Sequence, residues 1–186
     1  MRLATPRFTP LADAEMTGEQ RDALGPNRDR PRVLNIFRTM ARAPLALKRF
    51  LVWGDYILSD NSLSPRDREL VILRTGWQCR AGYEWVQHRR IGLRSGLTEA
   101  EVEAIKQGAA GPSWNEADRA LLDATDELVA DHFVSDATWA RLASFSDRQR
   151  MDLVFTVGQY TQVSMILNTF GVPLDDGQVL DPDFPR

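Results

Sequence analysis

The sequence predicts an all-α fold of about eight or nine helices. Apolar residues recur at helical spacing along almost all of the 186 residues, and convincing runs of alternating polar and apolar residues are missing. Helix start signals precede most of these periodic segments. Because 43% of the residues are hydrophobic, a chain of this length can bury one substantial core, and we expect a single domain over residues 1–186.

The first third of the chain predicts an arm followed by three helices. Two prolines interrupt residues 1–16, which we expect to form an extended arm, and a short helix should follow Thr17. The segment "PRVLNIFRTMARAP" predicts a helix that ends before Pro44. The segment "PLALKRFLVWGDYILSD" predicts the next helix, with Pro44 in its first turn.

The middle of the chain predicts a helical hairpin. In "NSLSPRDRELVILRTGWQC", Ser64 can cap a helix, Pro65 suits the first helical position, and the charge of Asp67 suits the first turn. These signals predict a helix over residues 65–78. A break at residues 80–82 then separates it from a second helix over residues 83–95.

Three capping boxes predict the starts of later helices. In each box a serine or threonine is followed three residues later by Glu or Gln, and a periodic segment comes next. The pairs are Thr98 with Glu101, Ser113 with Glu116, and Ser146 with Gln149. His132 is expected at the end of a helix. The turn-rich residues 171–186 are expected to form a surface tail.

The last long helix is apolar around most of its circumference. This holds from Val154 to Leu167. Such a helix is buried, either in the core of one chain or between subunits. The second alternative predicts a homo-oligomer.

Composition excludes several classes of protein. The net charge is −3 and the basic residues are spread widely, so we expect no nucleic-acid partner. The single cysteine, Cys79, excludes an internal disulfide, and neither a structural zinc site nor an iron–sulfur cluster could be assembled. No apolar run approaches the roughly 20 residues that cross a bilayer, and "MRLATPRFTPLADAEM" lacks the apolar stretch of a secretory signal. We expect a cytoplasmic protein without a membrane partner.

The stretch "WQCRAGYEWVQH", residues 77–88, holds the candidate site. Glu84 and His88 lie four residues apart and therefore on one face of the second hairpin helix. A carboxylate beside an imidazole can fix the ring tautomer, raise the histidine pKa and prepare it to donate a proton. Glu69, on the first hairpin helix, is a second acid that the hairpin could bring over this face. The alternative is a solvated surface pair, and Cys79 alone is most often a small buried hydrophobe.

The stretch "RDRELVILRTGWQCRAGYEWVQHRRIGLRSGLTEAEVEAI" resembles the core of the carboxymuconolactone decarboxylase family, which includes the alkylhydroperoxidase D-like proteins. Its most specific part is Glu-Trp-x-x-His, here Glu84, Trp85 and His88. The resemblance implies an alkylhydroperoxidase D-like helical bundle and a homo-oligomer: a dimer, trimer or hexamer.

The resemblance also separates two kinds of chemistry. The peroxidase branch carries a Glu, then Cys-x-x-Cys, then a His four residues after the second Cys. Counting back from His88, those two cysteine positions hold Ala81 and Glu84, while the upstream glutamate matches Glu69. Cys79 lies two residues before the first cysteine position. The chain is therefore similar to the decarboxylase-like branch, which implies proton transfer rather than thiol chemistry.

The resulting hypothesis is a cofactor-free decarboxylase acting on a small carboxylated lactone or unsaturated acid from aromatic breakdown. His88 would supply the proton, oriented by Glu84, and Glu69 would position His88 or the substrate. Five further residues are expected to bind substrate: Trp77, Tyr83 and Trp85 through desolvation and orientation, and Arg74 and Arg80 through its carboxylate. Two alternatives remain: a hydroperoxide reductase that uses Cys79 as a single redox thiol, and a non-catalytic oligomeric binding protein of the same fold.

Overall fold

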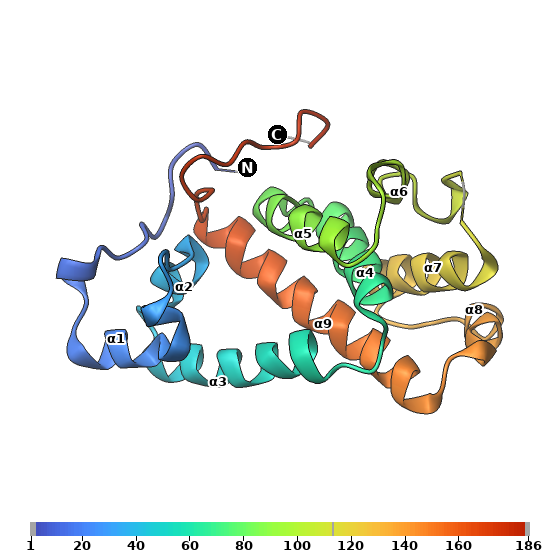
Figure 1. Ribbon diagram of the computed structural model, residues 1–186, viewed down its shortest axis with the longest axis horizontal. Helices are drawn as coiled ribbons and strands as arrows, with labels where there is room; N and C mark the ends of the chain where they lie inside the picture. The colour runs from blue at the N-terminus through green and yellow to red at the C-terminus, as the bar shows by residue number, and fades with distance from the viewer. Residues whose placement is uncertain (1–2, 113, 185–186) are drawn as a thin grey trace.

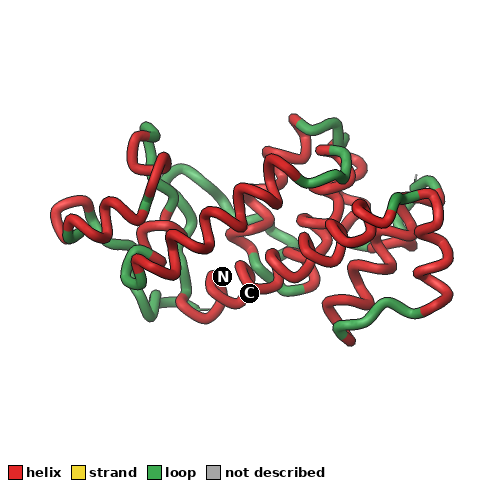
Figure 2. The backbone as a smooth tube through the Cα atoms, turned by 90° about the horizontal axis from the view of Figure 1, so that it is seen from below, coloured by secondary structure: helices red, strands yellow, loops and turns green. Residues whose placement is uncertain are grey.

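The computed structural model describes residues 3–112 and 114–184, and all regular secondary structure in these residues is helical (Figure 1, Figure 2). The predicted all-α fold is confirmed, with nine α-helices in the described ranges: α1 Gly18–Ala23, α2 Asn35–Met40, α3 Pro44–Asp55, α4 Pro65–Gln78, α5 Gly82–Arg94, α6 Glu99–Ile105, α7 Glu116–Asp131, α8 Asp136–Arg141 and α9 Asp147–Phe170. A π-helix, Tyr56–Asp60, continues α3.

The helix starts follow local capping chemistry at most of the predicted positions. The Ser64 side chain accepts from the Asp67 N–H at 3.1 Å, and the boxes at Thr98 and Ser146 are both formed. The third predicted box involves Ser113, which lies outside the described residues. Helix α7 begins at Glu116, where the Asn115 side chain caps it by accepting from the Asp118 N–H at 2.9 Å.

The hairpin of α4 and α5 lies at the centre of the molecule, and α9 crosses it diagonally (Figure 1). Helices α1 to α3 lie at one end of α9 and α6 to α8 at the other. Between α4 and α5 the chain turns through Arg80, whose φ of 53° is left-handed, and the Ala81 N–H bonds back to the Gly76 carbonyl at 2.8 Å. The predicted break is therefore a tight turn that aligns the two helices side by side.

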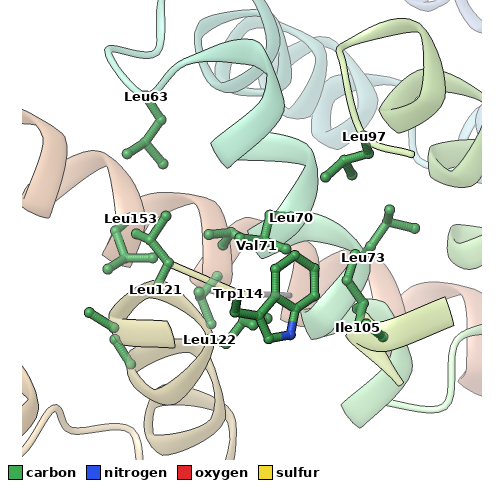
Figure 3. Close-up of a cluster of buried hydrophobic side chains, with 14 of the residues drawn as sticks. Leu63, Leu70, Val71, Leu73, Leu97, Ile105, Trp114, Leu121, Leu122 and Leu153 are labelled. Carbon is green, nitrogen blue, oxygen red and sulfur yellow. The ribbon is translucent and has the colours of Figure 1, made fainter. Parts of the chain in front are cut away.

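Two apolar clusters hold the hairpin in place. The larger joins α4 to α6, α7 and the first half of α9, and its side chains converge around Trp114 (Figure 3). The second lies on the other side, where Ile36, Ile57 and Ile72 pack against Tyr83 and Tyr160. Because α4 and α5 are buried between these clusters, their facing side chains are held within the protein.

One part of helix α9 is buried in the core, and another part is exposed at the surface. Leu153, Val157 and Leu167 are buried in the clusters, whereas Met151 and Met165 are 56% and 60% exposed. The described part of the chain contains no helix long and apolar enough to cross a membrane.

The C-terminal segment, expected as a surface tail, is anchored to the bundle in its described part. Phe184 is buried and packs against the rings of Trp77 and Trp85. Gly82 allows this approach, because a Cβ there would lie 2.4 Å from the Leu180 side chain. The segment thus covers α5, the helix that carries Glu84 and His88.

Candidate active site

Glycines bring the acidic residues of α4 and α5 together. A Cβ at Gly76 would lie 3.2 Å from Cγ of Glu84, and a Cβ at Gly92 would lie 2.9 Å from Leu97 Cδ1 and 3.6 Å from Cβ of Glu69. Larger residues at these two positions would force the helices apart. Because Gly76 and Gly92 have no side chains, the carboxyl groups of Glu69 and Glu84 can lie in one buried layer between α4 and α5.

His88 lies between those two carboxyl groups. Its Nδ1 donates to Oε2 of Glu69 at 2.7 Å, and its Nε2 lies 3.0 Å from Oε1 of Glu84. The second contact is an ion pair rather than an aligned hydrogen bond, since Oε1 has no hydrogen-bond partner among the described residues. All three side chains are at least nine-tenths buried. The structure thus brings the three predicted catalytic residues together.

The surroundings change the acidity of the cluster. Burial raises the pKa of Glu84 from its ordinary 4.5 to about 7; the nearby His88 works against this and Glu69 adds to it. For His88, burial lowers the pKa, but the negative charges of Glu69 and Glu84 outweigh burial and leave the pKa raised. The two carboxyl groups therefore favour the protonated form of the imidazole, and the pKa of Glu84 places its own proton exchange near neutral pH.

Tyr160 closes one side of the cluster. Its ring meets the His88 ring edge to face, with centroids 4.9 Å apart and an interplanar angle of 82°. Burial and the charges of Glu84 and Glu69 raise the pKa of Tyr160 well above its usual range, so the phenol stays neutral. This ring therefore shields the charged groups from water without adding a charge of its own.

A cavity of about 650 Å³ opens beside the cluster. Glu84 and His88 lie in its wall, together with Tyr83, Gln87, Gln159 and Tyr160. The opposite wall comes from the segment 22–58 and is largely apolar, including Ile36, Phe37, Phe50 and Ile57. The volume, together with apolar and polar side chains in one wall, fits a small-molecule site.

Neither of the two arginines predicted to bind substrate, Arg74 and Arg80, lines this cavity. The Arg74 guanidinium is bound to both carboxylate oxygens of Asp126 at 2.6 Å, and it also donates to the carbonyl of Ile105. Arg80 lies exposed in the turn between α4 and α5. Arg74 is therefore a structural cation that joins α4 to α7, and the expectation that these arginines hold a substrate carboxylate needs correction.

Trp77 and Trp85 lie on the other side of α5. Their ring centroids are 5.2 Å apart, Trp85 donates to Asp181 at 3.0 Å, and the Lys106 ammonium lies over both rings. Their expected role at the substrate is therefore replaced by one in anchoring the C-terminal segment. Tyr83 is the one predicted aromatic residue in the cavity wall. Cys79 ends α4 and is not among the residues that line the cavity.

Sequence reasoning missed the cations at this cavity, which are Arg30 and Lys48. Both are exposed and lie 54 and 36 residues before Glu84, so no helical spacing in the sequence links them to it. Gln159 and Tyr160 were also missed as cavity residues. The only sequence signal for them was the apolar circumference of the last helix, which does not say which face meets a ligand.

Together these features define an all-helical protein with a buried acid–imidazole cluster at a small-molecule cavity. Residues 42–127, which contain the whole cluster, match the model of the Carboxymuconolactone decarboxylase family. The α3–α7 region of the chain is therefore similar to this family. Among curated proteins, none matches the chain.

Solved structures share the fold. The alkylhydroperoxidase AhpD core of a peroxidase-related protein from Ralstonia eutropha JMP134 is 21% identical with a TM-score of 0.77, covering 92% of this chain and 93% of its own. ATU0492 from Agrobacterium tumefaciens is 21% identical with a TM-score of 0.69, covering 73% and 94%. The debrominase Bmp8, in complex with 2,3,4-tribromopyrrole, is 14% identical with a TM-score of 0.74, covering 93% and 94%. At these identities the likeness concerns the fold alone.

Proposed function

We propose that the protein is a cofactor-free decarboxylase-like enzyme that acts on a small carboxylated lactone or unsaturated acid from aromatic catabolism. The observation that carries the proposal is the position of Glu84, a buried carboxyl group that lies in the cavity wall and contacts His88. The match of residues 42–127 to the family model supports the same chemistry. A neutral carboxyl group beside an apolar cavity is suited to donate a proton to carbon.

The geometry favours Glu84 over His88 as the group that meets the substrate. Both nitrogens of His88 face carboxyl groups, at 2.7 Å and 3.0 Å. Glu84, in contrast, accepts no aligned hydrogen bond from the described residues at Oε1, and it lies in the cavity wall. We therefore assign proton donation to Glu84, and its reprotonation to His88, which Glu69 holds in place. This revises the role expected for His88.

The reaction balances without an added oxidant or reductant. The bond between the substrate carboxylate carbon and its neighbour breaks, CO₂ leaves, and the electron pair enters the adjacent unsaturated system. Glu84 delivers a proton to the far carbon of that system, and His88 passes a proton from solvent back to Glu84. Arg30 and Lys48 are the candidate partners of the substrate carboxylate in the cavity wall, which also holds Asp22 and Asp55.

The test is CO₂ release from a panel of carboxylated lactones and β,γ-unsaturated acids. Glu84→Gln keeps the size of the side chain but cannot donate the proton, and we expect kcat to fall by about 10²- to 10⁴-fold. Cys79→Ser serves as the matched control and should retain activity. A Glu84→Gln protein with wild-type kcat would refute the assignment.

Two observations favour the peroxidase alternative: the chain has the fold of a peroxidase-related protein from Ralstonia eutropha, and it contains one cysteine, Cys79. Hydroperoxide turnover that Cys79→Ser abolishes, while the variant stays folded, would establish it in place of the acid–base reaction. If neither assay shows turnover and the cavity binds no acid, the fold serves as a non-catalytic oligomeric protein.

We also propose that the protein forms a homo-oligomer through α9. Met151, Val154 and Met165 are exposed along one face of this helix, by 56%, 38% and 60%. No charged residue occurs between Leu153 and Phe170. An uncharged, partly apolar helix face of this length is suited to contact a second copy.

A further inference from the structure

Asp175, on the C-terminal segment, collects hydrogen bonds from the wall of the cavity. Its carboxylate is buried and accepts from the Tyr83 hydroxyl at 2.7 Å, from Gln87 Nε2 at 2.6 Å and from the Asn35 N–H at 2.9 Å. An ionised carboxylate can only accept, so each of these partners must turn a donor towards it. Asp175 thus fixes the direction in which two cavity-lining residues, Tyr83 and Gln87, donate their hydrogen bonds.

The consequence is clearest for Gln87. Its Nε2 also lies 3.3 Å from Oε1 of Gln178, so both amide hydrogens point to acceptors on the C-terminal segment. Oε1 of Gln178 accepts from the Asp175 N–H as well, which fixes its own orientation. The Gln87 amide therefore cannot rotate without losing these bonds, and its Oε1 receives no hydrogen bond from the described residues.

Gln87 lies next to the acid–base cluster. Gln87 is three residues after Glu84 on α5, hence on a neighbouring position of the same helix face, and it lines the same cavity. A buried or half-buried carbonyl beside a small-molecule cavity discriminates in favour of a ligand that offers a hydrogen. If the ligand offers only an ether or ester oxygen at this place, that oxygen and Gln87 Oε1 are both acceptors, and no hydrogen bond can form between them.

We propose that Gln87 is a specificity-determining residue: the cavity selects unsaturated or aromatic acids that carry a hydroxyl or N–H group, which donates to Gln87 Oε1, and Asp175 sets this preference by holding the amide. The inference rests on the proposed function for the acid part of the substrate. Phe37, Phe50 and Tyr160 supply the flat apolar walls that a ring or a conjugated chain fits.

The preference can be measured as binding, without turnover. The probes are benzoate, the three hydroxybenzoates and the three methoxybenzoates, titrated by calorimetry against the full-length protein. We expect at least one hydroxybenzoate to bind about tenfold more tightly than benzoate and than its methoxy counterpart. Gln87→Leu, which keeps the volume but removes the carbonyl, should abolish that ratio. Arg90→Gln, an exposed position on the same helix, is the matched control and should keep it.

Asp175→Asn tests the origin of the preference. An asparagine can donate as well as accept, so the Gln87 amide is free to turn, and the methoxybenzoates should gain relative to the hydroxybenzoates. Equal binding of hydroxy and methoxy probes by the wild type would overturn the proposal, and so would an unchanged ratio in Gln87→Leu. Failure to bind any of the seven acids would also count against it. Each result stands apart from the acid–base proposal, which the CO₂ assay decides.

Discussion

Replacing Glu84 by Gln should change how the stability of the protein depends on pH. Burial raises the pKa of this carboxyl group in the folded state to about 7, from an ordinary value of 4.5. The folded protein therefore binds the proton more tightly than the unfolded chain. The stability that this proton contributes is present below pH 4.5 and is lost as the pH rises through 7. The difference between these two pKa values lowers the free energy of unfolding by about 1 kcal/mol at pH 5 and by about 3 kcal/mol at pH 8.

The free energy of unfolding of the wild type should therefore fall by about 2–3 kcal/mol between pH 5 and pH 8 through this group. Glu84→Gln removes that loss. It also reduces the upward shift of the His88 pKa, to which Glu84 contributes and which acts in the same direction. Urea unfolding at pH 5, 6, 7 and 8 measures the profile, with Glu19→Gln, an exposed carboxyl group, as the control that should follow the wild type. Parallel profiles for the wild type and Glu84→Gln would refute the reasoning.

Three further outcomes are expected. The kcat of CO₂ release should fall as the pH rises through about 7, because Glu84 must be protonated to act, and a profile that instead rises there would contradict its role as the acid. Gly92→Ala should destabilise the protein by about 1–3 kcal/mol in urea unfolding, since the added Cβ would lie 2.9 Å from Leu97 Cδ1; an unchanged midpoint would show that the hairpin can relax. Light scattering should give a particle larger than the 21.0 kDa chain, and the double change Val154→Lys with Met165→Lys should reduce it to a monomer, whereas a wild-type monomer would end the oligomer proposal.

Local signals in the sequence predicted the fold well because helix starts are local chemistry. Ser64, Thr98 and Ser146 cap the helices that they predict, since each needs only the backbone N–H groups of the next turn. The start of α7 is capped by Asn115, which lies closer in sequence to the periodic segment than Ser113 does. Competition between nearby caps cannot be read from spacing alone.

The candidate site could be predicted only where its residues share the hairpin. Glu84 and His88 lie on one helix turn, and Glu69 comes from the helix just before, so the hairpin itself brings them together. Arg74 could not be placed, because its partner Asp126 lies 52 residues later on a helix whose packing the sequence does not show. The same limit applied to Asp175, which acts on the cavity from a segment that reads as a simple turn-rich tail.

The residues at two positions, Ala81 and Glu84, are the basis on which we propose proton chemistry for this chain. By the family spacing, Glu84 occupies the place where the peroxidase pattern has its second cysteine, and Ala81 occupies the first. A thiol at such a place can be oxidised and then reduced by its partner. A buried carboxyl group cannot, but with a pKa of about 7 it gains and loses a proton near neutral pH, and His88 lies 3.0 Å away to resupply it. In this chain we expect the exchange of a proton, with Cys79 left outside the cavity wall.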